Sequence, residues 1–164
     1  MKVLNWLGDR TVAKVVGVYH QLGENCEKLI TLSKAGWTIA GESKFTPEDG
    51  NDADIFTINS SGILTPEPDN PIDKEAVAVY LKFVLKKDSN LKPSRQIPER
   101  FALKIGYLPK DSILKQHIKY PTRVNIRCRT ISEGKNYFQA EIIGIPTALT
   151  PEGIKNNTFD LNID

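Results

Sequence analysis

Regular alternation of apolar and polar residues is the feature that most constrains the fold of this chain. Between residues 122 and 131, Val124, Ile126 and Cys128 are apolar and are separated by polar residues. Successive side chains of a strand point to opposite faces, so a period of two predicts a strand with one buried face. Residues 77–85 show the same period, with one fully apolar face. The chain is therefore predicted to be built around long β-strands.

The remaining elements are predicted from β-branched runs, helical spacing, and the turn formers Gly and Pro. Further strands are predicted at 11–20, 54–58, 101–108 and 136–145, and short helices at 24–34 and 109–120. Gly17 is expected to mark a bulge or a close backbone approach in the first strand. Residues 41–62 are expected to form an acidic loop region around the strand 54–58. This order predicts a mainly β fold, an OB-like partly open barrel of about six strands.

Chain length limits the domain organisation. A chain of 164 residues with 40% hydrophobic residues can bury one core but not two substantial ones. We expect one domain over residues 1–146, with an acidic insertion around 36–65, a basic linker at 86–100 and a tail at 147–164. We find neither a signal-peptide pattern nor an uncharged apolar run of about 18 residues. The expected location is therefore cytoplasmic, without a membrane partner.

Cysteine and histidine usage gives no sign of a metal site. Cys26 and Cys128 are the only cysteines, and they are far apart in sequence. We expect two buried, reduced thiols rather than a disulfide or a zinc site. His20 and His117 are equally isolated, whereas a metal site needs several ligands that converge. No metal or other cofactor is expected.

Charge is strongly segregated along the chain, although the formal net charge is only +2. Residues 74–135 contain 15 lysines and arginines and 5 acidic residues, a net charge of +10. Residues 36–73 contain one lysine and 8 acidic residues, a net charge of −7. A basic half of this kind indicates a polyanionic partner. The alternative is a solvated surface on which the charges mix after folding.

The polar face of the strand at 122–131 is the strongest candidate for contact with a polyanion. Arg123, Asn125, Arg127 and Arg129 share this face. Residues two apart on a strand are about 6.6–6.8 Å apart, which is close to the phosphate spacing of an extended single strand. A solvated face, or a strand edge protected by charge, is the alternative. Four aromatic residues of the basic half could stack with bases: Tyr80, Tyr107, Tyr137 and Phe138.

Two segments of the basic half and its flank carry a family resemblance. The first contains Asn70-Pro71-Ile72-Asp73 within 67–79, and the second runs from Ile105 to Asp111 through Gly106-Tyr107-Leu108-Pro109-Lys110. Together with the opening strand around Val15-Val16-Gly17, they resemble the linked motifs of HIRAN domains. The resemblance covers roughly residues 12–145. HIRAN domains are OB-like barrels, found alone in bacteria and phages and fused to fork-remodelling helicase-like ATPases in eukaryotes.

The resemblance implies a function and a set of site residues. The best understood HIRAN domains hold the free 3′ end of single-stranded DNA in a pocket lined by an Asn-Pro-Tyr-Asp loop. By that resemblance, Asn70 and Asp73 would face the terminal nucleotide, Tyr107 would line the pocket, and Lys110 would contact a phosphate. Lys14 would reach a phosphate from the opening strand. The basic face would add Arg123, Arg127 and Arg129 along the approach to the pocket.

This sequence departs from the family pattern at two places. Ile72 replaces the stacking tyrosine of the loop, and Ala13-Lys14 replaces an Arg-Tyr pair on the opening strand. We therefore expect a single-stranded DNA-binding module, with or without 3′-end recognition. It would serve DNA repair, replication or mobile-element processing, with a helicase or nuclease supplied in trans. The alternative is a protein-interaction module that has lost end recognition and uses the acidic insertion as its contact surface.

Catalytic motifs give no support for an enzyme. The glycines at 36 and 41 are not followed by the Lys and Ser/Thr of a phosphate-binding loop. No spacing suggests a nucleophile with its base or a pair of catalytic carboxylates. Glu133-Gly134-Lys135 has the spacing of one nuclease motif, and the acidic residues at 49–54 partly match a calcium loop. A metal-dependent nuclease therefore remains a further alternative to the expected non-enzyme.

Overall fold

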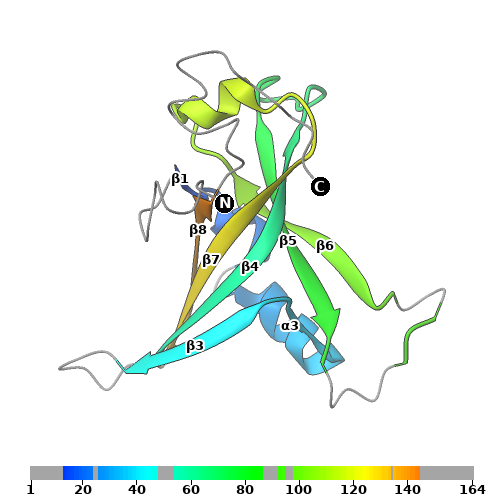
Figure 1. Ribbon diagram of the computed structural model, residues 1–164, viewed down its shortest axis with the longest axis vertical. Coiled ribbons are helices and arrows are strands. Elements are labelled where there is room, and N and C mark those ends of the chain that lie inside the picture. Colours follow the sequence, from blue (N-terminus) through cyan, green and yellow to red (C-terminus); the bar gives the residue numbers. More distant parts are fainter. Residues whose placement is uncertain are drawn as a thin grey trace.

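The computed structural model describes residues 13–23, 26–47, 54–86, 92–94, 98–133 and 135–144, and these are mainly β (Figure 1). The strands are β1 (Ala13–Lys14), β2 (Trp37–Ile39), β3 (Glu42–Pro47), β4 (Asp54–Pro66), β5 (Val77–Leu85), β6 (Arg100–Tyr107), β7 (Thr122–Glu133) and β8 (Lys135–Gly144). The helices are α2 (Val18–Leu22), α3 (Glu27–Ala35) and the 3₁₀ helix η2 (Ile113–His117).

The strands form one antiparallel sheet that curls into a partly open barrel. The order along the sheet is β1-β8-β7-β4-β5, and β6 pairs with the other edge of β5. A single bridge between Val16 and Tyr107 joins the two ends, with N–H···O distances of 2.9 and 2.8 Å. Val15 also donates a hydrogen bond to Ala140 on β8. The prediction of a mainly β, partly open barrel is confirmed.

The barrel opens at one end, where β4 and β5 separate. The two strands pair only over Gly62–Pro66 and Val77–Leu81. Beyond this stretch β4 pairs with β3, and β5 pairs with β2. Figure 1 shows β4 and β5 side by side in the upper part of the molecule and apart in the lower part. We call the point of separation the fork.

The long strand β4 corrects the prediction of a loop over residues 41–62. Ser60-Ser61-Gly62 has the composition of a turn, yet these residues lie inside a 13-residue strand. Both edges of β4 are paired, and Gly62 packs so closely on Ile126 that a side chain there would collide with it. Gly62 is therefore needed for packing at this point, not for a turn. The predicted acidic insertion contributes β2, β3 and β4 to the sheet.

The apolar face of each strand forms the core of the barrel. The fully buried side chains include Leu64, Val79, Leu81, Ile105, Ile126 and Ile142. Leu22 of α2 and Leu114 of η2 close the core, and Leu29 and Leu32 of α3 pack against it. The predicted alternation on β5 and β7 is confirmed by this burial pattern.

The opening strand and the helices differ from prediction in extent. Strand pairing of the predicted strand 11–20 stops at Val16, because Gly17 takes a left-handed conformation (φ 73°) and starts α2. Gly17 therefore forms neither the predicted bulge nor a close backbone approach, since an added Cβ would lie 3.8 Å from the Tyr107 ring. The helix predicted at 24–34 is present as α3. The helix predicted at 109–120 is shorter, and it is the 3₁₀ helix η2.

Candidate nucleic-acid interface

The loop between β4 and β5, residues 67–76, is held by its own polar groups. The Asn70 side-chain oxygen accepts hydrogen bonds from the backbone N–H groups of Ile72 and Asp73, each at 3.0 Å. Its amide nitrogen donates to Glu67 Oε1 at 3.0 Å. The prolines at 68 and 71 restrict the backbone further, since each fixes its own φ angle. We call this segment the proline loop, and its bonding makes it rigid.

Glu67 ties the proline loop to β6. Lys104 Nζ lies 2.7 Å from Glu67 Oε2, and the Tyr107 hydroxyl donates to Glu67 Oε1 at 2.9 Å. Burial alone would raise the pKa of Glu67, but hydrogen bonds from Lys104, Asn70 and Tyr107 outweigh burial and lower it. The same contacts with Glu67 and Tyr107 raise the pKa of Lys104, so the pair is charged at neutral pH.

The proline loop and β6 border an open surface pocket of about 450 Å³, which we call the loop pocket. Its lining is Pro66, Glu67, Pro68, Asp69, Asn70, Pro71, Lys104 and Tyr107. The structure therefore brings together two predicted site residues, Asn70 and Tyr107. Both side chains already bond to Glu67, so each has a structural role in addition to its predicted one.

Asp73 does not line the loop pocket and bonds instead to Lys115 of η2. Its Oδ2 lies 2.5 Å from Lys115 Nζ, and its Oδ1 accepts from the Glu75 backbone N–H at 2.9 Å. The hydrogen bond from Lys115, that from Glu75 and the nearby charge of Lys110 lower the pKa of Asp73. The Lys115 side chain is only 6% exposed, so Asp73 supplies its counter-charge. A ligand that contacts Asp73 would have to compete with this ion pair.

The predicted arginine face of β7 is present. Arg123, Asn125 and Arg129 are exposed, and the intervening Val124, Ile126 and Cys128 are buried. Neither Arg123 nor Arg129 forms an ion pair within the described part of the chain. They are therefore the two arginines of this face whose charge is available to a ligand.

Arg127 is the exception on this face, because it is paired. Its guanidinium lies 2.9 Å from Glu141 on β8, and the two side chains are only 13% and 11% exposed. Lys14 on β1 lies opposite Glu141 in the strand register and is itself exposed. Lys14, Glu141 and Arg127 therefore form one row across three neighbouring strands.

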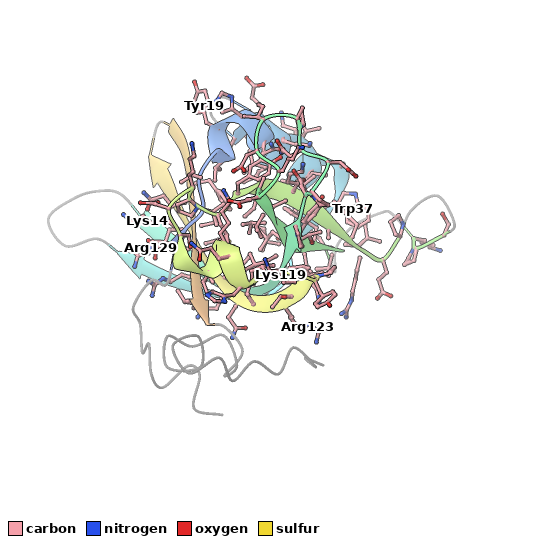
Figure 2. The ribbon with its side chains drawn as sticks, turned by 90° about the horizontal axis from the view of Figure 1, so that it is seen from above. Lys14, Tyr19, Trp37, Lys119, Arg123 and Arg129 are labelled. Carbon is pink, nitrogen blue, oxygen red and sulfur yellow. The ribbon has the colours of Figure 1, made fainter. Side chains whose placement is uncertain are left out.

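No residue of the arginine face lines the loop pocket. Around the barrel, β5 and β4 separate β6 from β7 in one direction, and β8 and the residues around Val16 separate them in the other. Figure 2 shows Lys14 and Arg129 on one side of the barrel and Trp37, which lies beside β5, on the other. Arg127 and Arg129 therefore do not border the loop pocket, and their position along the approach to it stays a prediction. Alternation gives the face of a strand, but not its position around a barrel.

Sequence reasoning missed the cations that lie between these two regions. Arg123 pairs in register with Ile63, Ile63 with Tyr80, and Tyr80 with Lys104. Three strand spacings of about 4.8 Å separate the ends of this row by about 14 Å. Lys82 and Arg100 face outward on the same two strands as Tyr80 and Lys104. The alternation of residues 77–85 places Tyr80 and Lys82 on one face of the strand. This pattern is the sequence feature from which Lys82 could have been predicted as part of the interface.

The four strands β6, β5, β4 and β7 present an outward face that is basic. Its outward residues with described side chains include six cations and no acidic residue. The cations are Lys82, Arg100, Lys104, Arg123, Arg127 and Arg129. Tyr80 is half-buried in the middle of this face. The other predicted aromatics differ, because Phe138 belongs to the core and the Tyr137 side chain lies outside the described residues.

No protein-family model, curated protein or solved structure matches this chain. Among the described residues, no three His, Cys, Asp or Glu side chains lie close enough together to hold a metal ion. None of the described helices is long and apolar enough to span a membrane. Residues 49–52 of the partial calcium motif and the middle of Glu133-Gly134-Lys135 lie outside the described residues.

Proposed function

We propose that this chain is a non-catalytic module that binds single-stranded DNA along the outward face of β7. One observation carries the proposal: Arg123 and Arg129 are exposed, unpaired within the described residues, and placed on a face where β4 contributes no charge. Cations in such a row attract a phosphate backbone without reading its sequence. The neutral Asn59 and Ser61 of β4, which pair with this strand, can donate further hydrogen bonds.

We assign recognition of a strand end to the loop pocket. A volume of about 450 Å³ is in the range of small-ligand sites and can hold one nucleotide. The rigid proline loop would meet the nucleotide without losing much conformational entropy on binding. Lys104 would contact the last phosphate in competition with its ion pair to Glu67. Asp73, held by Lys115, would act indirectly by fixing the loop position.

The test of DNA binding is the salt dependence of affinity for a labelled oligothymidylate, measured by fluorescence anisotropy. Arg123→Gln and Arg129→Gln should each weaken binding and reduce the slope of log K against log salt by about 0.7, the value for one phosphate contact on a single strand. Lys28→Gln on α3 removes an equally exposed charge from another element and should change neither quantity. Affinity that does not fall between low and moderate salt would reject the proposal.

End recognition needs a separate experiment. Unlabelled oligonucleotides with a free 3′-hydroxyl and with a 3′-phosphate should compete unequally if the loop pocket holds the terminus. Equal competition, with salt-sensitive binding retained, would leave backbone binding along β7 and dismiss the end-binding role. The module would then bind internal stretches of single-stranded DNA, and a helicase or nuclease acting in trans would meet it there.

A protein-interaction function is favoured by one observation of its own. Ile72 is 95% exposed at the tip of the proline loop, where a rigid backbone presents an apolar side chain to solvent. Apolar anchors of this kind fill pockets of partner proteins. An Ile72→Asp variant that keeps full affinity for DNA but loses a co-purifying partner protein would identify this second function.

A further inference from the structure

A second pocket lies at the fork, on the outward surface of the sheet. Its volume is about 460 Å³. We call it the fork pocket, and its lining is Ala40, Gly41, Asn59, Ser60, Ser61, Lys82, Arg100, Asn125 and Ile143. These residues come from β4, β5, β6, β7, β8 and the segment between β2 and β3. The outward surface is therefore hollow where β4 and β5 separate.

The back of the fork pocket is fixed by the chain at residues 40 and 41. The Ala40 N–H donates to the Lys82 carbonyl at 2.9 Å, and the Ser60 hydroxyl donates to the Ala40 carbonyl. Gly41 passes so close to β4 that an added Cβ would lie 2.3 Å from the Asn59 carbonyl oxygen. These contacts tie β5 to β4 across the fork. The pocket is thus a built feature of the sheet and not a gap between loops.

The lining suits a phosphate group with an attached sugar or base. Lys82 and Arg100 supply two positive charges, and neither forms an ion pair within the described residues. Asn59, Ser61 and Asn125 supply neutral hydrogen-bonding groups, and the lining contains no carboxylate. Two cations beside amide and hydroxyl donors match a phosphodiester, which carries one negative charge and several acceptor oxygens.

The fork pocket also joins the two regions of the proposed interface. Asn125 lies between Arg123 and Arg127 on β7, so the arginine face continues into the pocket. On the other side, Lys82 lies two residues from Tyr80, which pairs with Lys104 of the loop pocket. We infer that the fork pocket binds a phosphodiester of a single strand that crosses the barrel from β7 to β6. This inference rests on the proposed function and adds a site and a path to it.

Salt dependence tests the fork pocket in the full chain. Lys82→Gln combined with Arg100→Gln should weaken oligothymidylate binding and reduce the salt slope by about 1.4, which corresponds to two single-strand phosphate contacts. The matched control is Lys28→Gln combined with Lys34→Gln, which removes two exposed charges from α3. Thermal unfolding of each variant checks that the fold is retained. A double variant with the wild-type slope and affinity would overturn the inference.

A second measurement separates failure of the inference from failure of the proposed function. Backbone amide NMR shifts are recorded while oligothymidylate and, separately, inorganic pyrophosphate are added to the wild type. Shifts at Ser61, Lys82 and Asn125 with both probes support the inference. Shifts there with pyrophosphate alone would keep an anion site and reject single-strand binding. Oligonucleotide shifts restricted to Arg123 and Arg129, with no change at the fork, would keep the proposed function and reject the fork pocket.

Discussion

The alternation of β7 places Arg127 on a basic face, but the residues around it give it a structural role. Its ion pair with Glu141 is largely shielded from solvent, and removing one partner of such a pair leaves a poorly solvated charge. Arg127→Met should therefore lower the free energy of unfolding by about 3 kcal/mol. Urea denaturation measures this change. Arg127→Met combined with Glu141→Leu should regain much of the loss, and a single variant as stable as wild type would contradict the assignment.

The carboxyls of Glu67 and Asp73 make stability depend on pH. Hydrogen bonds and nearby lysines lower both pKa values in the folded state. Such groups contribute their full stabilisation above the pKa that they have in the unfolded state, which is about 4. This contribution is lost as the pH falls through their lower pKa in the folded state. Between about pH 5 and pH 3, wild type should lose more stability than Glu67→Gln combined with Asp73→Asn.

Melting temperatures across that pH range are the measurement, and Asp69→Asn is the control because this exposed carboxylate lies in the same loop. The control should keep the wild-type pH dependence. The double variant should be less stable than wild type at pH 7, since Lys104 and Lys115 lose their charged partners. Parallel curves for wild type and the double variant would show that the two ion pairs contribute nothing to the acid transition.

At the scale of elements, the fork depends on how closely the segment 40–41 approaches β4. Gly41 has φ 151°, and an added Cβ would also collide with the Asn59 carbonyl. Gly17 has φ 73°, but a Cβ there would make only ordinary contact, 3.8 Å from the Tyr107 ring. Gly41→Ala should therefore cost more than about 3 kcal/mol of folding free energy, and Gly17→Ala about 1–2 kcal/mol.

Urea denaturation of the two variants measures that difference, which combines the steric collision at Gly41 with its less accessible backbone conformation. The fork pocket predicts one more effect of Gly41→Ala. Because the backbones must move apart, Lys82 and Asn59 should show amide shift changes larger than those at Leu22 in the distant α2. A variant as stable as Gly17→Ala would mean that β3 and β4 adjust easily.

At the scale of the molecule, the two cysteine thiols differ in how far the structure must open before a reagent can reach them. Cys128 is completely buried in the core, and burial raises the pKa of its thiol to about 12. Cys26 is only half-buried, although burial raises its pKa as well. Thiol reagents attack the thiolate, so Cys128 in the Cys26→Ser variant should react only as fast as the whole barrel opens. Labelling at pH 8 with increasing urea measures this, and rapid labelling of the native variant would contradict a closed core.

Much of the fold could be predicted because alternation is a local property of the chain. The strands at 77–85 and 122–131, their buried faces and the buried position of Cys128 all follow from it. The prediction failed at β4, whose small polar residues have the composition of a turn. Only neighbours on both edges, including Ile126 against Gly62, show that a glycine is required there.

The candidate site was predictable as a set of residues but not as an arrangement. Sequence alone determined the arginine face of β7 and the concentration of positive charge in one half of the chain. Only the tertiary structure decided that Asp73 bonds to Lys115, that Arg127 bonds to Glu141, and that β4 and β5 lie between β6 and β7. The reason is physical: side-chain direction along a strand is set by the backbone period. Which charges meet is set by the order in which distant strands pair around the barrel.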